Sequence, residues 1–149
     1  MTIEAQEARL IPVAGISGNK EAEARATSAL LAVLSIVRPF SKALLTPLGA
    51  SRSTRAKVEA FTEVTFETPS GRTVRPDGLL RVTYGKRDSF VALIEVKTGD
   101  AKLEAEQIHA YVEVARQHNY DCVITISNEI APSPNVHPTD GLRGPANRR

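Results

Sequence analysis

Apolar and polar positions along the chain follow two periods, one typical of helices and one typical of strands. Apolar residues recur at helical spacing from Asn19, a residue type that favours the start of a helix, to about Arg38, where Pro39 ends the pattern. Helical spacing returns after Asp100, which is predicted to cap the helix that ends near His118. In chain order, the predicted elements are helices over 19–38 and 40–47, strands over 58–66, 73–84 and 90–97, a helix over 101–118 and a strand over 120–127.

This order predicts an α/β fold with a mixed central sheet flanked by helices. The run 90–94 is apolar on both faces, which suits a central strand that is covered on both sides. The last strand follows a helix, so we expect it to run parallel to the third strand through a right-handed crossover. Residues 1–18 are predicted to be a loose leader, 19–127 the folded domain, and 128–149, rich in Pro, Asn and Gly, a flexible tail.

Length and amino-acid composition are those of a single globular domain and do not by themselves indicate a function. The 149 residues suffice for one domain, and no apolar run reaches the length of a membrane-spanning helix, so no membrane partner is expected. The lone Cys122 cannot form an internal disulfide and is expected in the core, which favours the cytoplasm. The formal charge of +2 is too small to indicate nucleic-acid binding by itself.

Basic residues gather in two places, and such clusters could neutralise phosphates. They could equally be ordinary solubilising charge. The first cluster is Arg52, Arg55 and Lys57 in a Ser/Gly/Ala-rich loop, and the second is Arg72, Arg75 and Arg81 around the first of two short motifs.

The two motifs are Arg75-Pro76-Asp77-Gly78 and Ile94-Glu95-Val96-Lys97, each within a predicted strand. Either motif alone is more often a turn or a solvated strand face. Together, on neighbouring strands, they could bring the carboxylates of Asp77 and Glu95 to one hydrated cation. Oxygen ligands favour Mg²⁺, with Mn²⁺ as a substitute, and the Val96 carbonyl could add a further ligand. Lys97 shares a strand face with Glu95, where its ammonium could orient water or offset charge on a phosphate.

With these motifs and this order of elements, the chain resembles the PD-(D/E)XK nuclease superfamily over about residues 19–127. The resemblance implies a restriction-endonuclease-like αβββαβ core. It also implies that Asp77 and Glu95 bind the divalent metal and that Lys97 assists hydrolysis.

Two further positions extend the resemblance. Gln107 and Tyr111, four residues apart on one helix face, look like the Q-x-x-x-Y motif of the RecB-like exonuclease branch, which places Gln107 at the active site and Tyr111 near the substrate. The alternative is a surface glutamine and an aromatic residue at the core edge. Glu23 on the first helix is the expected auxiliary acid, although a Glu-rich helix start is also favourable by itself, and Glu63 is a further possible ligand.

The predicted function is therefore Mg²⁺-dependent hydrolysis of DNA phosphodiester bonds, with RNA open as a substrate. Catalytic roles fall to Asp77, Glu95, Lys97, Gln107 and Glu23. Substrate contacts are expected from Tyr111, Arg52, Arg55, Lys57 and Arg75. A homodimer or a partner domain is compatible with the sequence. The alternative function is a nuclease-fold module that binds nucleic acid or supports assembly with little or no cleavage.

Overall fold

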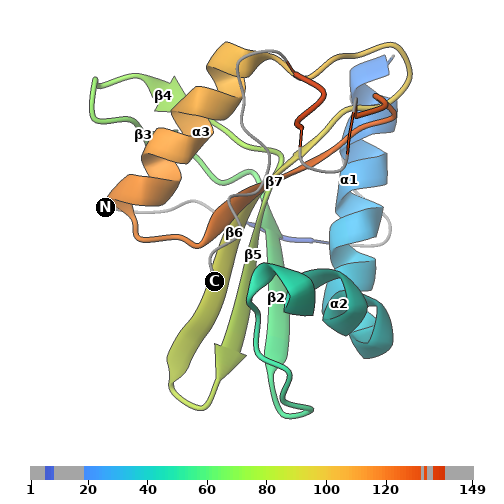
Figure 1. Ribbon diagram of the computed structural model, residues 1–149, viewed down its shortest axis with the longest axis vertical. Coiled ribbons are helices and arrows are strands. Elements are labelled where there is room, and N and C mark those ends of the chain that lie inside the picture. The colour runs from blue at the N-terminus through green and yellow to red at the C-terminus, as the bar shows by residue number, and fades with distance from the viewer. Residues whose placement is uncertain (1–5, 9–18, 132, 134–135, 140–149) are drawn as a thin grey trace.

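A mixed sheet with the strand order β1-β2-β5-β6-β7 runs through the middle of the molecule (Figure 1). The computed structural model describes residues 6–8, 19–131, 133 and 136–139. Neighbouring strands are antiparallel except β6 and β7, which are parallel, so the predicted parallel pair is confirmed. The strands are β1 (Gln6–Glu7), β2 (Lys57–Thr62), β5 (Gly78–Tyr84), β6 (Arg87–Val96) and β7 (Cys122–Ile126).

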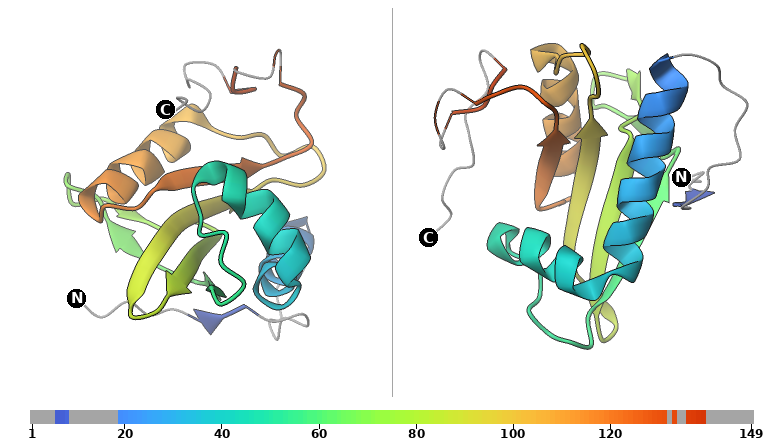
Figure 2. Two further views of the ribbon diagram at one scale, coloured as in Figure 1. Left: turned by 60° about the horizontal axis from the view of Figure 1, so that its bottom comes forward. Right: turned by 90° about the vertical axis from the view of Figure 1, so that its right-hand side faces the viewer.

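Helices cover the two faces of this sheet (Figure 2). They are α1 (Asn19–Ile36), α2 (Arg38–Leu45), the short 3₁₀ helix η1 (Thr46–Leu48) and α3 (Ala105–Gln117). Alternate residues of β6 enter different cores, as the two-residue period of a strand requires. Ile94 packs in a cluster with Leu31 of α1, whereas Leu93 packs in a cluster with Val114 of α3. Burial on both faces confirms that β6 is a central strand.

The two helices predicted over 19–47 are both present, but their boundaries differ from the prediction. Val37 separates α1 from α2 with a non-helical backbone (φ −92°, ψ 85°). Pro39 lies in the first turn of α2, where its missing N–H costs no helical hydrogen bond. The proline therefore belongs to the start of the second helix, and this helix begins two residues earlier than predicted.

The first two predicted strands are each interrupted. Glu63 has a positive φ of 63°, which ends β2. The chain then forms a separate two-stranded sheet of β3 (Phe66–Glu67) and β4 (Thr73–Val74). Pro76 lies between β4 and β5, and a proline has no N–H to donate to a strand ladder. The apolar alternation continues through both breaks, which is why the sequence pattern predicts two unbroken strands.

The third long helix starts later than predicted, and Asp100 is not its cap. α3 begins after Glu104, whose side chain makes no capping hydrogen bond. The preceding residues are held by the chain that follows β7. The Leu103 N–H donates to Glu129 Oε2 at 2.9 Å, and Asn128 Nδ2 donates to the Gly99 carbonyl at 2.7 Å. These contacts keep residues 98–103 in a loop beside the end of β6.

The two ends of the chain are described only in part. Gln6 and Glu7, expected within the loose leader, instead form β1 on the edge of the sheet against Thr62 and Phe61. This pairing is made by the backbone, so a polar dipeptide gives no sequence signal for it. The remaining leader residues lie outside the described part of the chain. Of the expected tail, the described residues include a bridge between Ser133 and Val136.

Within the described residues, no single helix has the length and apolar character needed to cross a membrane. One pair, Glu21–Ile36 with Arg38–Leu48, meets those two criteria together, but its members are bent by 100°.

Candidate active site

Asp77 and Glu95 meet at the edge where β5 begins and β6 ends. The antiparallel register pairs Gly78 with Ile94, so the preceding Asp77 comes opposite Glu95. The Val96 N–H donates to Asp77 Oδ2 at 2.7 Å and fixes the Asp77 carboxylate against β6. The sequence prediction that neighbouring strands bring the two acids together is therefore consistent with the observed register.

Glu95 is the most deeply buried charged residue of this group. Its residue exposure is 1 %, and it forms an ion pair with Lys97, whose Nζ lies 2.6 Å from Glu95 Oε1. Apart from this ammonium, neither Glu95 oxygen has a well-formed hydrogen bond within the described residues, although the Tyr111 hydroxyl and the Asp77 carboxyl lie close enough to influence it. A buried carboxylate with open acceptor positions is costly unless a cation or a proton completes its surroundings.

Glu23 reaches the same place from α1. Its Oε1 lies 3.6 Å from Lys97 Nζ, and its Oε2 accepts a long hydrogen bond of 3.5 Å from the Thr98 N–H. Figure 2 shows the first turns of α1 beside the end of β6, at the upper end of the molecule. Lys97 thus lies between the acids of Glu95 and Glu23. The sequence-based placement of Glu23 near the other acids agrees with this geometry.

The absence of a side chain at Gly78 allows α1 to lie close to β5. A Cβ at this position would overlap the side chain of Leu31, and it would come within 3.2 Å of the Phe61 carbonyl oxygen. Because Gly78 directly follows Asp77, this close approach also brings α1 and its Glu23 toward the strand ends.

Burial and neighbouring charges shift the pKa values of Asp77, Glu95 and Lys97. Burial raises the pKa of Asp77 above its ordinary value, against the hydrogen bond from Val96. Burial and the neighbouring Asp77 charge raise the pKa of Glu95. Burial works to lower the pKa of Lys97, but its hydrogen bond and attraction to Glu95, with smaller contributions from Glu23 and Asp77, raise it overall. Strong coupling of this kind is common at functional sites.

The donor set fits a hard divalent cation. Mg²⁺ characteristically binds one or two protein carboxylates and keeps several waters, and Asp77 and Glu95 are two carboxylates on facing strand positions. Within the described residues, no group of three or more His, Cys, Asp and Glu side chains is arranged to hold a metal by itself. The expected contribution of the Val96 carbonyl stays a prediction.

Tyr111 and Gln107 lie beside this group, but Tyr111 is not a surface contact. It is 2 % exposed, accepts a hydrogen bond from Gln107 Nε2 at 2.9 Å and donates one to the Arg75 carbonyl at 3.1 Å. Burial and the Glu95 charge raise the pKa of its phenol, so the hydroxyl stays protonated. Because Arg75 precedes Pro76-Asp77, the phenol holds the segment that positions Asp77. The sequence gives no signal for this hydrogen bond to a main-chain carbonyl.

We expect Tyr111→Phe to reduce stability and function together. The substitution removes the hydrogen bond to the Arg75 carbonyl, which costs about 0.5–1.5 kcal/mol of unfolding free energy. Tyr84→Phe, at an exposed hairpin position, is the matched control and should change neither. Urea unfolding and Mn²⁺ titration of both variants measure the effects. A Tyr111→Phe protein that matches the Tyr84→Phe protein in both would contradict this role for the phenol.

The basic residues near the first motif are already engaged in ion pairs. Arg75 pairs with Glu63, and Arg72 Nη1 lies 2.9 Å from Glu106 Oε1 of α3. Arg81 Nη2 lies 3.3 Å from Glu59 Oε2, and its guanidinium lies 5.3 Å from the centre of the Phe61 ring. Glu63 is therefore a partner of Arg75, and its possible role as a further ligand stays a prediction.

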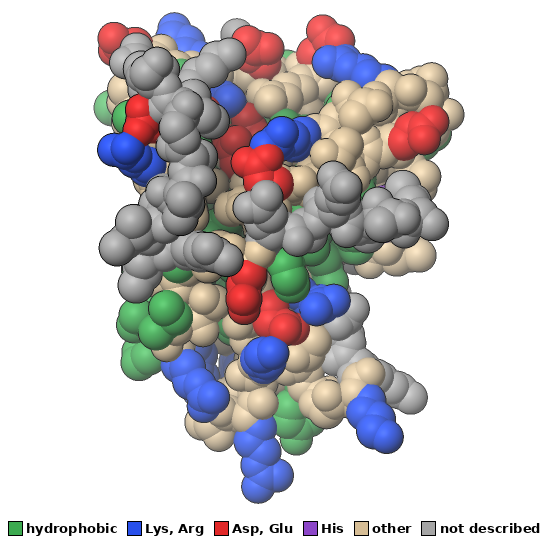
Figure 3. All heavy atoms as spheres, turned by 180° about the vertical axis from the view of Figure 1, so that it is seen from behind, with side chains coloured by type: hydrophobic (Ala, Val, Ile, Leu, Met, Phe, Trp, Pro, Cys, Tyr) green, Lys and Arg blue, Asp and Glu red, His purple; other side chains and the backbone are tan. Residues whose placement is uncertain are grey.

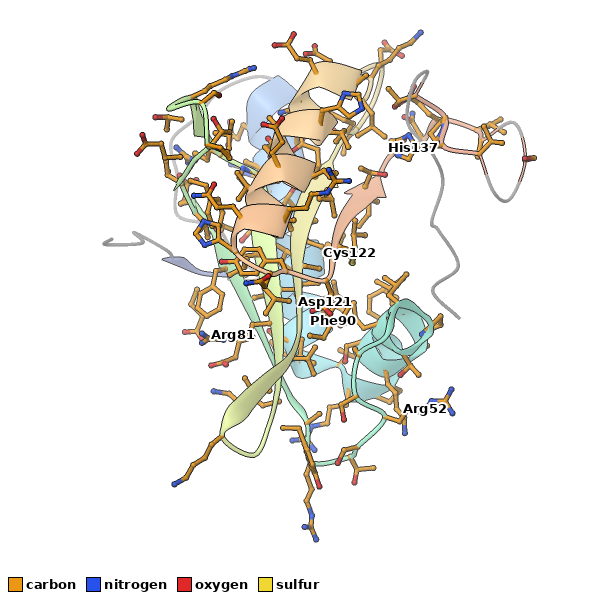
Figure 4. The ribbon with its side chains drawn as sticks, turned by 60° about the vertical axis from the view of Figure 1, so that its left-hand side comes forward. Arg52, Arg81, Phe90, Asp121, Cys122 and His137 are labelled. Carbon is orange, nitrogen blue, oxygen red and sulfur yellow. The ribbon has the colours of Figure 1, made fainter. Side chains whose placement is uncertain are left out.

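The first basic cluster does not lie at the candidate site. Lys57 pairs with Thr83 and Gly78 with Ile94, so five positions of β5, or about 17 Å of strand, separate Lys57 from the carboxylates. Arg52 lies on the loop next to α2 (Figure 4). Basic side chains gather at this lower end, whereas acidic and basic side chains mix at the upper end (Figure 3). The predicted substrate contacts from the cluster of Arg52, Arg55 and Lys57 therefore lie away from the Asp77–Glu95 carboxylates, whereas Arg75 is two residues from Asp77.

Cys122 is not poised as a nucleophile. Burial, helped by the Asp121 charge, raises the pKa of its thiol to about 11. Because the thiolate is the reactive form, we expect alkylation by iodoacetamide at pH 8 to be about a hundredfold slower than in the unfolded chain. Mass spectrometry of the native and the guanidinium-unfolded protein provides the comparison. Equal rates in the two states would show that the thiol is accessible and ionises normally.

Comparisons of this chain with protein-family models, curated proteins and solved structures give no match.

Proposed function

We propose that this protein is a Mg²⁺-dependent nuclease that hydrolyses DNA phosphodiester bonds. The observation that carries the proposal is the buried Glu95, whose carboxylate has only the Lys97 ammonium as a well-formed partner and lies next to Asp77. Structural ion pairs rarely leave a buried carboxylate with unfilled acceptor positions. The order of the elements and the motif residues also support a restriction-endonuclease-like core, consistent with the resemblance to PD-(D/E)XK nucleases.

Asp77 and Glu95 would hold the cation between them, and the Val96 N–H keeps the Asp77 carboxylate in place. A divalent cation at this position supplies Lewis-acid stabilisation of a phosphoryl oxygen and a more acidic water. Lys97 would hold a positive charge next to the developing negative charge of the phosphate. Its pKa is raised, so the ammonium is present throughout the neutral range.

Glu23 and Gln107 have supporting roles in this proposal. Glu23 contacts Lys97 from the side of α1 and would fix the direction of the ammonium. Gln107 donates to the Tyr111 hydroxyl and would keep the phenol aimed at the Arg75 carbonyl. Both are then positioning residues, and neither needs to touch the phosphate.

The first experiment is a cleavage assay with linear duplex, supercoiled and single-stranded DNA, each with Mg²⁺, Mn²⁺ or EDTA. We expect at least one substrate to be cut with either cation and none with EDTA. An RNA of the same sequence as the single strand tests the second substrate class. Cleavage that EDTA leaves unchanged would contradict the proposal. DNA binding without metal-dependent cleavage would instead favour a nuclease-fold binding module.

The positions of the basic residues predict a contrast between two arginine variants. Arg75→Gln should raise KM for a short DNA oligonucleotide, because Arg75 immediately precedes the Pro76-Asp77 segment and its side chain is 55 % exposed. Arg55→Gln removes an exposed arginine from the distant loop and should leave KM for the same oligonucleotide unchanged. Steady-state kinetics at fixed ionic strength measure both, since phosphate contacts depend on salt. An effect of Arg55→Gln equal to that of Arg75→Gln would contradict this assignment.

A further inference from the structure

A cavity of about 380 Å³ lies between α2, the loop over 50–56 and the lower parts of β2 and β5. Figure 2 shows these elements at the end of the molecule opposite to the start of α1 and the end of β6. The volume falls within the range of small-molecule pockets, about 300–1,000 Å³. This cavity is therefore separate from the Asp77–Glu95 group and large enough for a ligand of its own.

The floor of the cavity is apolar. Leu45 and Val82 are each 2 % exposed and Ala50 is 7 % exposed, and the half-buried Ala56 and Val58 extend the same surface. Such side chains offer no hydrogen bonds, so the part of a ligand that rests on them must itself be apolar. A bare phosphate or a nucleic-acid backbone would not match this floor.

The rim of the cavity is basic. Arg38 and Lys42 lie one helical turn apart on α2, and both line the opening. The other polar lining residues carry hydroxyl groups, and no lining residue is acidic. Arg38 Nη1 donates to the Thr54 carbonyl at 3.1 Å and so ties the loop to α2. Lys42 is exposed and forms no ion pair within the described residues, so its ammonium is available to a ligand.

We propose that this cavity binds a small amphipathic carboxylate. The apolar body of the ligand rests on Leu45 and Val82, and its carboxylate meets the ammonium of Lys42 and the guanidinium of Arg38. Charge complementarity selects an anion over a cation, and the apolar floor selects a hydrocarbon chain over a short, fully polar acid. The site does not depend on the proposed nuclease function.

Sodium octanoate is the probe, and an amide-proton chemical-shift titration of isotopically labelled protein is the measurement. We expect saturable shifts confined to residues 38–58 and the region of Val82. Octylammonium, with the same chain and the opposite charge, and acetate, with the same head and no chain, should each give no saturable binding. Binding of octylammonium as tightly as octanoate, or shifts spread over the whole chain, would overturn the proposal.

Lys42→Ala should weaken octanoate binding about fivefold, the upper value for an exposed ion pair. Both Lys42 and the control residue, Lys102, are exposed, so neither substitution is expected to disturb the fold. Lys102→Ala, which lies near the start of α3, should bind octanoate as the wild type does. If Lys42→Ala bound octanoate as tightly as the wild type, the proposed contact between the carboxylate and the basic rim would be overturned. Asp77→Asn should leave octanoate binding intact. Failure of the proposed nuclease function would therefore not be mistaken for failure of this binding site.

Discussion

Lys97→Met is expected to abolish DNA cleavage and also to destabilise the protein. The methionine retains much of the side-chain volume but removes the positive charge that contacts both Glu95 and Glu23. Glu95, at 1 % exposure, then keeps a buried charge without its partner. Removal of one partner from a buried ion pair costs on the order of 3 kcal/mol of unfolding free energy. Loss of a group that stabilises transition-state charge lowers kcat by at least about a hundredfold.

Lys102→Met is the matched control, since it removes an exposed lysine near the same end of the molecule and should change neither quantity. Urea unfolding of the metal-free proteins gives the free energies, and single-turnover cleavage gives the rates. A Lys97→Met protein with wild-type stability would mean that the ammonium does not compensate the buried carboxylates. Wild-type cleavage by this protein would remove Lys97 from the catalytic group.

Glu95→Gln is expected to abolish cleavage while stabilising the metal-free protein at pH 8, because Lys97 keeps Glu23 as a second acidic contact whereas the Glu95 charge has Lys97 as its cation. The raised pKa of Glu95 means that burial and the Asp77 charge outweigh the attraction of Lys97, so the ionised carboxylate costs stability in the folded state. That cost is present above the raised pKa and disappears as the pH falls below the ordinary value of 4.5. The stability gained by Glu95→Gln over the wild type should therefore decrease as the pH falls from 8 to 4.

Thermal unfolding of the wild type and Glu95→Gln with EDTA, across this pH range, shows directly which of the two proteins is more stable. Glu104→Gln, at an exposed position before α3, is the control and should show no such pH-dependent gain. Added Mn²⁺ should stabilise the wild type and not Glu95→Gln, because only a protein that binds the cation gains stability from it. A Glu95→Gln protein that is less stable than wild type at pH 8 would show that the Glu95–Lys97 pair dominates instead.

The sequence predicts the central features of the fold because they depend on regular patterns. The apolar run before Glu95 indicates a central strand, and the helix after it favours a parallel return, which β7 provides. The meeting of Asp77 and Glu95 follows from the antiparallel pairing of two consecutive strands. Glu23 could be predicted because it continues the apolar stripe of α1 toward the sheet.

Other features depend on contacts that leave no local pattern. The phenol of Tyr111 bonds to a main-chain carbonyl, so only the folded chain reveals that it positions the Asp77 segment. The start of α3 is delayed by Glu129, a residue more than twenty positions further along the chain. Arg52 and Arg75 each belong to a basic cluster of the sequence, yet Lys57, in the cluster of Arg52, pairs with Thr83 at the end of β5 that lies away from Gly78. Charge clusters therefore need their three-dimensional positions before they indicate a substrate.

The most direct test of the proposed function compares wild type and Asp77→Asn on one end-labelled DNA substrate with saturating Mg²⁺. We predict that the wild type cleaves and that the rate falls about a thousandfold in Asp77→Asn, the equivalent of roughly 4 kcal/mol of metal-derived stabilisation. Both proteins must give the same circular dichroism spectrum, so that misfolding does not explain the loss. Equal cleavage by the two proteins, or no cleavage by the folded wild type on any of the DNA forms, would contradict the account.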